Sequence, residues 1–460
     1  MKDKSQELQR TLGLLPSASL VVGTIIGTGV FLKAAIMSQL VGSSFWVLVA
    51  WAVAGVLSLA GALTYAEIGI LFPRAGGEYV YLREAYGNLT AFLYGWQRFL
   101  ISNTGTIAAY AVGAATFAAP LFDLSWCGGV KGFSILLIAI FSGLNCLNVT
   151  FGGRLQSVMT IIKVMMIFFI VIGILFLSPT SSFSYISAGG GAFPGFSAFG
   201  SAILAALWAY DGWNNLPMVA GEIKNPSRNI PLSLGLGVFF IVAIYVLIHF
   251  CYFMAMPFSE VISANSNIHP DALPVAAKAA QSFLGSTGVW FLGIAMIFSA
   301  VGAMNGSILT SARIPYAMAI DGLFHRSLAT LHKKSKSPYV SVLTQGMIAA
   351  VLALSGTFDQ LTDYVVFASW IFYALVASSV FVFRRKHPEM ARPYKTLGYP
   401  YLPVLFLISA LLLLINTVWT MPKESSIGLA LILLGVPFYY FMERAPVSSS
   451  PVVSNELPKP

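Results

Sequence analysis

The segment Gly23-Thr24-Ile25-Ile26-Gly27-Thr28-Gly29-Val30-Phe31 lies in the middle of the first long apolar run, residues 14–40. Three glycines within seven residues weaken a helix at the depth where a membrane-spanning helix should be continuous. In hydrocarbon an unpaired backbone amide or carbonyl costs several kcal/mol, so a break there is stable only where it lines a cavity. The pattern therefore predicts a discontinuous membrane helix.

The backbone groups released by such a break suggest one role for it, and its small residues suggest another. Amides after a break face an anion and carbonyls before it face a cation, so an amino acid zwitterion would satisfy both. Small residues at short intervals also suit close contact between membrane helices. This segment alone leaves a binding site and a helix-packing face open as alternatives.

The composition is that of an integral membrane protein. Of the 460 residues, 57% are hydrophobic and 9% are charged, whereas soluble proteins have about 25% charged residues. A cleavable signal peptide is not expected, because residues 1–10 are polar and the apolar run that follows is too long for the hydrophobic region of one. The net charge of +9 does not indicate nucleic-acid binding, because the basic residues lie mainly in short loops. Three cysteines cannot build a disulfide framework.

Twelve apolar runs are long enough to cross a bilayer as helices, each near the required length of about 20 residues. They fall at residues 14–40, 45–70, 89–118, 132–150, 156–178, 197–220, 231–255, 287–318, 339–356, 360–383, 400–419 and 426–442. An even number puts both termini on one side, where the termini and loops hold nineteen Lys and Arg residues against three on the other. This excess predicts a cytoplasmic N-terminus, residues 1–13, and a disordered cytoplasmic tail, residues 443–460.

A second interruption occurs in the sixth run. The segment Trp208-Ala209-Tyr210-Asp211-Gly212-Trp213-Asn214-Asn215 places an acid, a glycine and two amides where apolar residues should continue. Paired interruptions at corresponding positions of two halves point to a transporter binding site. The breaks are five helices apart, which predicts two inverted repeats, residues 14–178 and 197–383, with two extra helices in residues 400–442. The second break favours the binding site over the packing face.

Three further features carry expectations. The cytoplasmic loop Phe72-Pro73-Arg74-Ala75-Gly76-Gly77-Glu78-Tyr79 is predicted to form a short interfacial helix. Arg98 and Arg313 lie near the ends of their runs and are expected to snorkel to the interface. Glu67 lies near the cytoplasmic end of the second run and is expected to be structural.

Four motifs give the chain a family resemblance. They are GTIIGTGVF (23–31), AEIG followed by FPRAGGEYVYLREAYG (66–87), AYDGW followed by GEIKNPSRNIP (209–231) and MNGSILTSARIPYAMA (304–319). Over essentially its whole length the chain resembles the amino acid–polyamine–organocation superfamily, and within it the L-type amino acid transporters and the bacterial serine/threonine exchanger. The resemblance implies an all-α membrane protein with a 5+5 inverted repeat of the leucine-transporter type. Its expected activity is sodium-independent exchange of neutral L-amino acids across the cytoplasmic membrane by alternating access, without a cofactor.

The resemblance also implies a substrate site made of backbone groups at the two breaks. The carboxylate is expected on the amides of Gly27, Thr28 and Gly29, and the amino group on the carbonyls of Ile25, Trp208 and Asp211. A half-helix N-terminus carries about +0.5 charge, which agrees with this polarity. Trp208 takes the position of the family's aromatic gate, with a packing aromatic as the alternative. Asn103 and Asn214 are further candidates for the pocket.

Two charged residues inside the runs have alternative interpretations. Asp211 would either cap a helix restarting at Gly212 or act as an intramembrane carboxylate that attracts the ammonium group or takes a proton. Lys163 lies roughly 13 Å past Arg154 along its helix, so it would either snorkel or bond the carbonyls of the first break and polar groups such as Ser299. Sodium-independent members of the superfamily resemble this chain in having a lysine there, which implies a tethered cation in place of sodium.

Other classes of function are kept as alternatives. A proton-coupled amino acid or polyamine permease would use the same fold, with Asp211 or Glu67 titrating. A channel would require a symmetric ring of polar residues around a pore, which the two unlike breaks do not provide. A sensor would require an output domain, which the sequence does not show. An enzyme is not expected, nor is a metal site. Animal members pair with a heavy subunit through a loop cysteine, but the surroundings of Cys127 do not match, so a monomer with a free thiol is expected.

Overall fold

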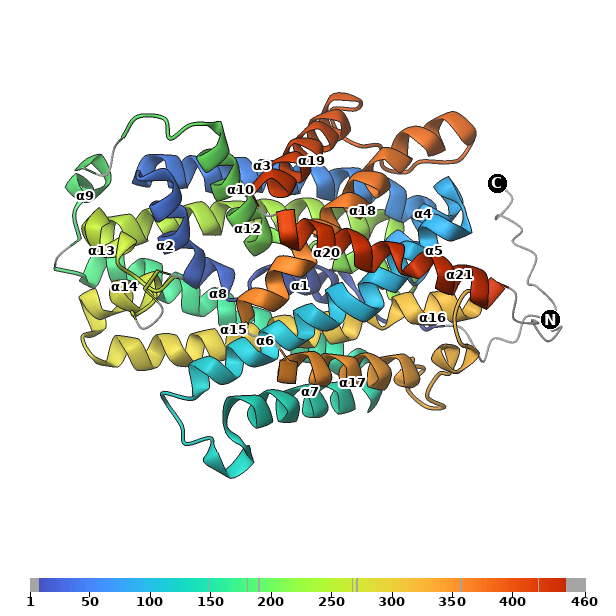
Figure 1. Cartoon of the computed structure of the whole chain (residues 1–460), viewed down its shortest axis with the longest axis horizontal. Coiled ribbons are helices and arrows are strands. Elements are labelled where there is room, and N and C mark those ends of the chain that lie inside the picture. The colour runs from blue at the N-terminus through green and yellow to red at the C-terminus, as the bar shows by residue number, and fades with distance from the viewer. Residues whose placement is uncertain are drawn as a thin grey trace.

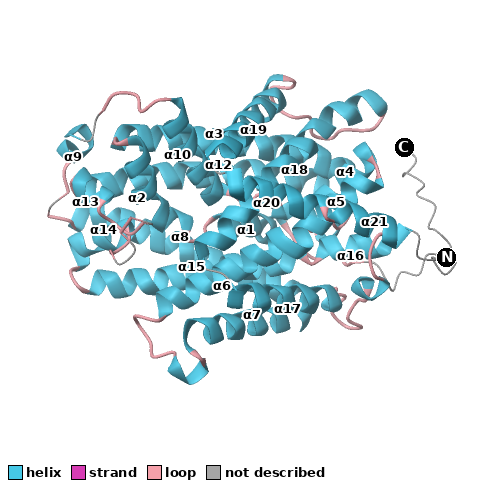
Figure 2. Cartoon of the chain, in the orientation of Figure 1, coloured by secondary structure: helices cyan, strands magenta, loops and turns pink. Residues whose placement is uncertain are grey.

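The computed structural model describes residues 8–147, 149–179, 181–188, 191–266, 268–269, 272–355, 358–420 and 422–443. Throughout this part the chain is helical, with short connecting loops (Figure 2). The helices are α1 (Leu14–Ile25), α2 (Gly29–Val41), α3 (Ser44–Leu71), α4 (Glu78–Tyr86), α5 (Asn88–Gln97), α6 (Asn103–Ala118), α7 (Gly129–Leu147), α8 (Val149–Ile172), α9 (Phe183–Ala188), α10 (Phe196–Tyr210), α11 (Asn215–Met218), α12 (Pro226–Ala255), α13 (Phe258–Ile262), α14 (Val275–Leu284), α15 (Thr287–Ser311), α16 (Arg313–Ile320), α17 (Tyr339–Ser355), α18 (Phe358–Lys386), α19 (Tyr401–Thr420), α20 (Pro422–Leu433) and α21 (Gly435–Glu443).

Eight helical segments in the described residues are long and apolar enough to cross a membrane. They are Leu14–Val41, Ser44–Leu71, Gly129–Leu147, Phe151–Leu177, Pro226–Ala255, Thr287–Ile320, Tyr401–Thr420 and Ser425–Met442. The other four predicted spans fall on α5 with α6, on α10 with α11, on α17 and on α18. The chain is therefore an all-helical, multi-pass membrane protein. The count of twelve spans and the 5+5 repeat stay predictions. Of the predicted tail, residues 443–460, Glu443 is the last residue of α21, and the rest lies outside the described residues.

The helix α1 lies at the centre of the molecule, in contact with α8, α12 and α15 (Figure 1). It ends at Ile25, and Ile26 leaves the helical conformation with φ −69° and ψ 89°. The chain turns helical again as α2 at Gly29. The predicted interruption of the first run is present, within the glycine-rich segment.

The sixth run is also interrupted. Helix α10 ends at Tyr210 and α11 begins at Asn215, with Gly212 at φ +120° between them. Only glycine adopts this conformation without strain. A Cβ at Gly212 would also lie 2.9 Å from the Thr24 carbonyl carbon and 3.1 Å from the Ile25 nitrogen. The two breaks are thus in direct backbone contact, and Thr24 Oγ1 donates a hydrogen bond of 3.0 Å to the Gly212 carbonyl.

The predicted interfacial helix over Phe72–Tyr79 is wrong in position, because α4 begins only at Glu78. The preceding glycines, Gly76 and Gly77, have φ of +103° and +48°, which end helical geometry there. Gly76 donates its amide to the Met218 carbonyl at 2.9 Å. A Cβ at Gly77 would lie 2.7 Å from the Met218 nitrogen. The loop therefore holds α4 closely against α11, the second part of the interrupted sixth run.

Candidate functional site

The first turn of α2 offers unpaired backbone amides. Phe31 donates its amide to the Thr28 carbonyl at 3.1 Å. Of the three amides expected to hold the carboxylate, those of Thr28 and Gly29 donate to no other group within the described residues, whereas Gly27 donates to the Ile25 carbonyl; the neighbouring Val30 amide is also unpaired there. The Thr28 hydroxyl is buried and also has no hydrogen-bond partner there. Unpaired amides at a helix N-terminus carry partial positive charge, so this turn can hold an anion such as a carboxylate.

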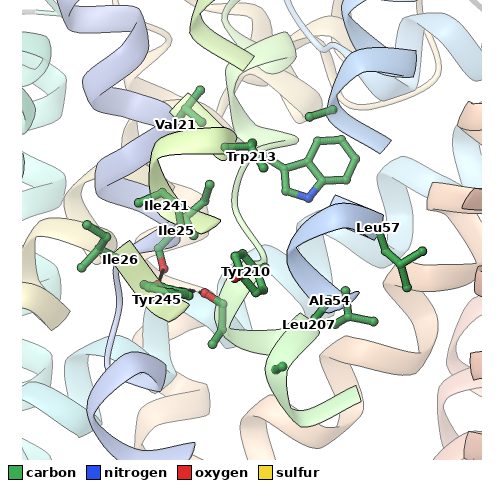
Figure 3. Close-up of a cluster of buried hydrophobic side chains, with 14 of the residues drawn as sticks. Val21, Ile25, Ile26, Ala54, Leu57, Leu207, Tyr210, Trp213, Ile241 and Tyr245 are labelled. Carbon is green, nitrogen blue, oxygen red and sulfur yellow. Dashed lines mark hydrogen bonds between the residues drawn. The ribbon is translucent and has the colours of Figure 1, made fainter. Parts of the chain in front are cut away.

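The carbonyl side of the first break is occupied by protein donors. The Ile25 carbonyl accepts from the Gly27 amide at 2.7 Å and from the Tyr245 hydroxyl at 3.0 Å. The same hydroxyl lies 3.1 Å from the Ala209 carbonyl, so Tyr245 on α12 joins the two breaks (Figure 3). Sequence reasoning missed Tyr245, since one tyrosine in an apolar helix gives no local signal. The contact of Ile25 with a substrate amino group stays a prediction.

Lys163 and Ser299 meet at the carbonyls of the same break. Lys163 is 2% exposed, and its Nζ donates to the carbonyls of Gly23 and Ile26 at 2.8 and 2.7 Å. Ser299 Oγ lies 3.2 Å from the Ile26 carbonyl and 2.8 Å from that of Gly27. Lys163 therefore does not snorkel to the interface. Its functional role stays a prediction.

A glycine on α15 makes room for the lysine. A Cβ at Gly302 would lie 2.6 Å from Lys163 Cε and 3.0 Å from its Nζ. Since Cβ atoms do not approach other atoms so closely, a larger residue would displace the ammonium group. The glycine pattern of α15 thus contributes to the position of this buried cation.

Trp208 lies against α2, the second half of the interrupted first run. A Cβ at Gly29 would lie 3.0 Å from the Trp208 ring and 2.7 Å from the Cβ of Ala209. The Lys33 ammonium group lies 4.8 Å from the centre of the indole ring, within the range of a cation–π interaction. Trp208, a residue of α10, thus packs against α2, and its action as a gate stays a prediction.

Asp211 does not cap the next helix, so that alternative is wrong. It follows the last residue of α10, and the N-cap of α11 is Asn214. The Asp211 carboxylate accepts a hydrogen bond of 2.6 Å from the Tyr373 hydroxyl on α18. Asn214 donates its side-chain amide to Glu78 at 3.3 Å. Asn103 is 7% exposed, and its Nδ2 has no partner among the described residues.

Arg98 and Arg313 both lie in buried ion pairs. The prediction that their side chains extend to the membrane interface is therefore wrong. Arg98 is 3% exposed and bonds Glu78 at 3.1 Å. Arg313 is fully buried and bonds both oxygens of Glu222, at 2.7 and 3.0 Å. Glu78 and Glu222 both lie outside the predicted membrane-spanning runs. Their sequence surroundings do not indicate that either pairs with an arginine inside the helix bundle. These pairs join α4 to the end of α5, and the segment after α11 to α16.

The Glu222 pair predicts a large effect on stability. Removing one partner of a buried ion pair leaves an uncompensated charge and costs about 3–5 kcal/mol. We expect Glu222→Ala to lower the thermal unfolding temperature of the detergent-solubilised protein strongly. Glu84, which is 30% exposed and bonds Arg74 at 3.2 Å and Arg83 at 3.3 Å, provides a control, since each surface pair contributes about 0–1 kcal/mol. Equal shifts for Glu222→Ala and Glu84→Ala would contradict the assignment.

An all-helical membrane protein with two interrupted helices in contact is the construction of a secondary transporter. The sequence profile of the amino acid permease family matches residues 12–442, and the chain belongs to this family of the amino acid–polyamine–organocation superfamily. It is 31% identical over 451 residues to the serine/threonine exchanger SteT of Bacillus subtilis (strain 168), which covers 97% of this chain and 100% of that protein.

Mammalian relatives are nearly as similar. The chain is 29% identical over 444 residues to the human b(0,+)-type amino acid transporter 1, covering 95% of this chain and 89% of that one. It is 28% identical over 445 residues to the large neutral amino acids transporter small subunit 2 of Mus musculus, covering 94% and 81%. The similarity to these proteins extends over nearly the whole chain, so it includes both interrupted helices.

Proposed function

We propose that the protein exchanges neutral L-amino acids across the cytoplasmic membrane by alternating access, without sodium and with both termini in the cytoplasm. The observation that carries this proposal is the contact between the two helix breaks, beside three unpaired amides and a buried lysine. The amides suit a carboxylate, and the nearby carbonyls suit an ammonium group. The exchanger activity in the name of the Bacillus subtilis relative supports the same mechanism.

The amino group is proposed to bind the carbonyls of Ile25, Trp208 and Asp211. The Ile25 carbonyl already has two donors, one of which is the Tyr245 hydroxyl. That hydroxyl has a single proton and lies within bonding distance of the Ala209 carbonyl as well. Tyr245 can therefore donate to Ala209 when an ammonium group occupies the Ile25 carbonyl, so binding leaves neither carbonyl without a donor.

The proton-coupled alternative has two candidate carboxylates, and one of them has strong partners of its own. Glu67 accepts two hydrogen bonds from Arg384, at 2.9 and 2.7 Å, and a third from the Thr396 amide at 2.7 Å. Bidentate Arg–carboxylate pairs are strong and geometrically specific. Protonating Glu67 would break this arrangement, which favours a structural role for it and leaves Asp211 as the carboxylate for the proton-coupled alternative.

We propose that the protein works as a monomer without a heavy subunit. Cys127 is a free cysteine, and its Sγ lies 3.3 Å from the Leu124 carbonyl within a short turn. Purification from membranes under non-reducing conditions tests this proposal. A single 49.4 kDa band is expected, and a disulfide-linked partner that disappears in Cys127→Ser would contradict it.

Efflux from proteoliposomes tests the function. The liposomes are preloaded with one labelled amino acid, and each unlabelled amino acid is supplied outside in turn, in sodium-free buffer with no pH gradient. Efflux only in the presence of particular neutral amino acids outside is expected and identifies the substrates. Efflux without any amino acid outside, or efflux that depends on a pH gradient, would contradict exchange.

Trp208→Ala is expected to slow exchange much more than it weakens substrate binding. The ring lies against Gly29 and under Lys33, so its loss removes contacts between the outer half-helices during closure. We expect turnover to fall about tenfold or more, while the dissociation constant of the substrate, measured by thermal stabilisation, changes less. Weaker binding with unchanged turnover of bound substrate would make Trp208 a pocket wall instead.

A further inference from the structure

A chain of polar side chains extends behind the second break and is not used by the proposed function. The Tyr373 hydroxyl donates to Asp211 at 2.6 Å and accepts from Arg98 Nη2 at 3.3 Å. The same Nη2 lies 3.1 Å from Glu78. Four elements meet here, namely α4, the π-helical turn Arg98–Ser102, α18 and the end of α10.

The hydrogen-bonded side chains of this network, from Asp211 to Glu78, differ in their exposure to solvent. Glu78, Arg98 and Tyr373 are 0%, 3% and 2% exposed, whereas Asp211 keeps a partly exposed side chain. Asp211 precedes Gly212, the residue in backbone contact with the first break. Within this network of side chains, the Asp211 carboxylate is thus the group nearest the candidate substrate site. The charged groups of Arg98 and Glu78 lie farther from it.

Glu78 is surrounded by donors from several helices. Tyr65 donates to its Oε1 at 2.8 Å, and Tyr94 and Asn214 donate to its Oε2. With Arg98 this makes four donors to the two oxygens of Glu78. The Arg98 guanidinium reaches Asp211 through the Tyr373 hydroxyl, which accepts from Arg98 and donates to Asp211. One cation therefore serves two carboxylates.

The charge count of this cluster matches one ammonium group. With Asp211 ionised, the two carboxylates and one guanidinium leave a single net negative charge, and the Lys163 ammonium is engaged by the carbonyls of Gly23 and Ile26. Net charge in a water-poor interior is costly, so a bound group that neutralises it is favoured. The α-ammonium of a neutral amino acid brings this charge to zero. With a lysine or arginine substrate, the cluster and the two cationic groups of the substrate would have a net charge of one positive.

We propose that Arg98 is a specificity-determining, positioning residue: by neutralising one of the two carboxylates, Glu78 and Asp211, it restricts the site to amino acids with a single positive charge. Arg98 acts through Tyr373 and does not touch the substrate. The inference rests on the proposed function and names its substrate class, amino acids with uncharged side chains. Removing the guanidinium alone leaves two negative charges, which match the two cationic groups of lysine.

Three variants of the pair test the inference in the proteoliposome assay, with labelled L-lysine as the cationic probe and labelled L-serine and L-leucine as neutral probes. Arg98→Gln is expected to raise the ratio of lysine to neutral exchange at least about tenfold, the change that corresponds to about 1.4 kcal/mol. Arg98→Lys keeps the charge and is expected to keep the wild-type ratio. Arg98→Gln with Glu78→Gln returns the net charge to one negative and is expected to restore the preference for neutral amino acids.

Glu78→Gln alone supplies a second test in case Arg98→Gln does not fold. It leaves no net charge on the cluster, so the KM for the neutral probes is expected to rise about tenfold, while lysine stays excluded. A lysine ratio unchanged in Arg98→Gln, or raised equally in Arg98→Lys, would overturn the inference, as would an unchanged KM in Glu78→Gln. Comparable lysine and neutral exchange by the wild type would also overturn it. A wild type that exchanges neither neutral probe would instead reject the proposed function.

Discussion

Replacing Lys163 by alanine is expected to remove most amino acid exchange, leaving about a tenth of the wild-type rate or less. Its ammonium group donates to the carbonyls of Gly23 and Ile26, on the two sides of the point where α1 ends. Hydrogen bonds to charged groups contribute about 1.5–3 kcal/mol each, and 1.4 kcal/mol is a factor of ten. Without the lysine, the end of α1 loses its charged contact with α8, whereas the hydrogen bond from Thr160 to the Ser19 carbonyl remains. Initial exchange rates per inserted molecule measure this effect.

The loss should not come from failed membrane insertion. A lysine at this depth costs about 2.5–3.5 kcal/mol on insertion scales, so alanine removes a penalty. Ser299→Ala is the matched control, because Ser299 donates to the same Ile26 carbonyl without a charge, and a smaller loss is expected. Wild-type exchange should be equal in sodium and choline buffers. A strong sodium requirement, or full activity of Lys163→Ala, would reject the tethered-cation hypothesis.

The features that could be predicted from the sequence are those with a local cause. Glycines at 23, 27 and 29 inside an apolar run predict a break because the run sets the depth and the glycines weaken the helix. The acid and glycine at 211 and 212 do the same in the sixth run. The depth of Lys163 follows from helical rise alone, and this depth made carbonyl contacts a reasonable hypothesis. The membrane class, the family and both helix interruptions could therefore be predicted from the sequence.

The features that could not be predicted depend on contacts between distant segments. Glu222 and Arg313 are 91 residues apart, and neither their spacing nor their surroundings indicate a pair. Arg98 looked like an interfacial residue because it lies near the end of its run, and only the packing of α4 brings Glu78 to it. Tyr245 joins the two breaks across 220 and 36 residues. Side-chain partners of this kind are set by tertiary packing, which periodicity and composition do not describe.

Adding a side chain at Gly27 or Gly29 is expected to abolish substrate binding while the protein remains inserted. At Gly27 a Cβ would lie 3.0 Å from the Tyr110 ring, and at Gly29 it would lie 3.1 Å from the backbone of Ala209. The amides of Thr28, Gly29 and Val30 have no partner in the described residues, and a carboxylate must approach them closely to bind. Gly27→Val and Gly29→Val should therefore show no thermal stabilisation by any transported amino acid.

Two comparisons separate loss of the amide site from simple overpacking. Gly143→Ala is the control, because a Cβ at Gly143, within α7, meets nothing within 4 Å, and alanine is the better helix former. It should bind and exchange as the wild type does. Gly27→Ala combined with Tyr110→Leu removes the ring that the new methyl group would meet, yet the methyl group still crowds the amides. We expect binding to stay lost in this double variant, whereas recovery to near wild-type affinity would assign the defect to the Tyr110 contact and reject the carboxylate site.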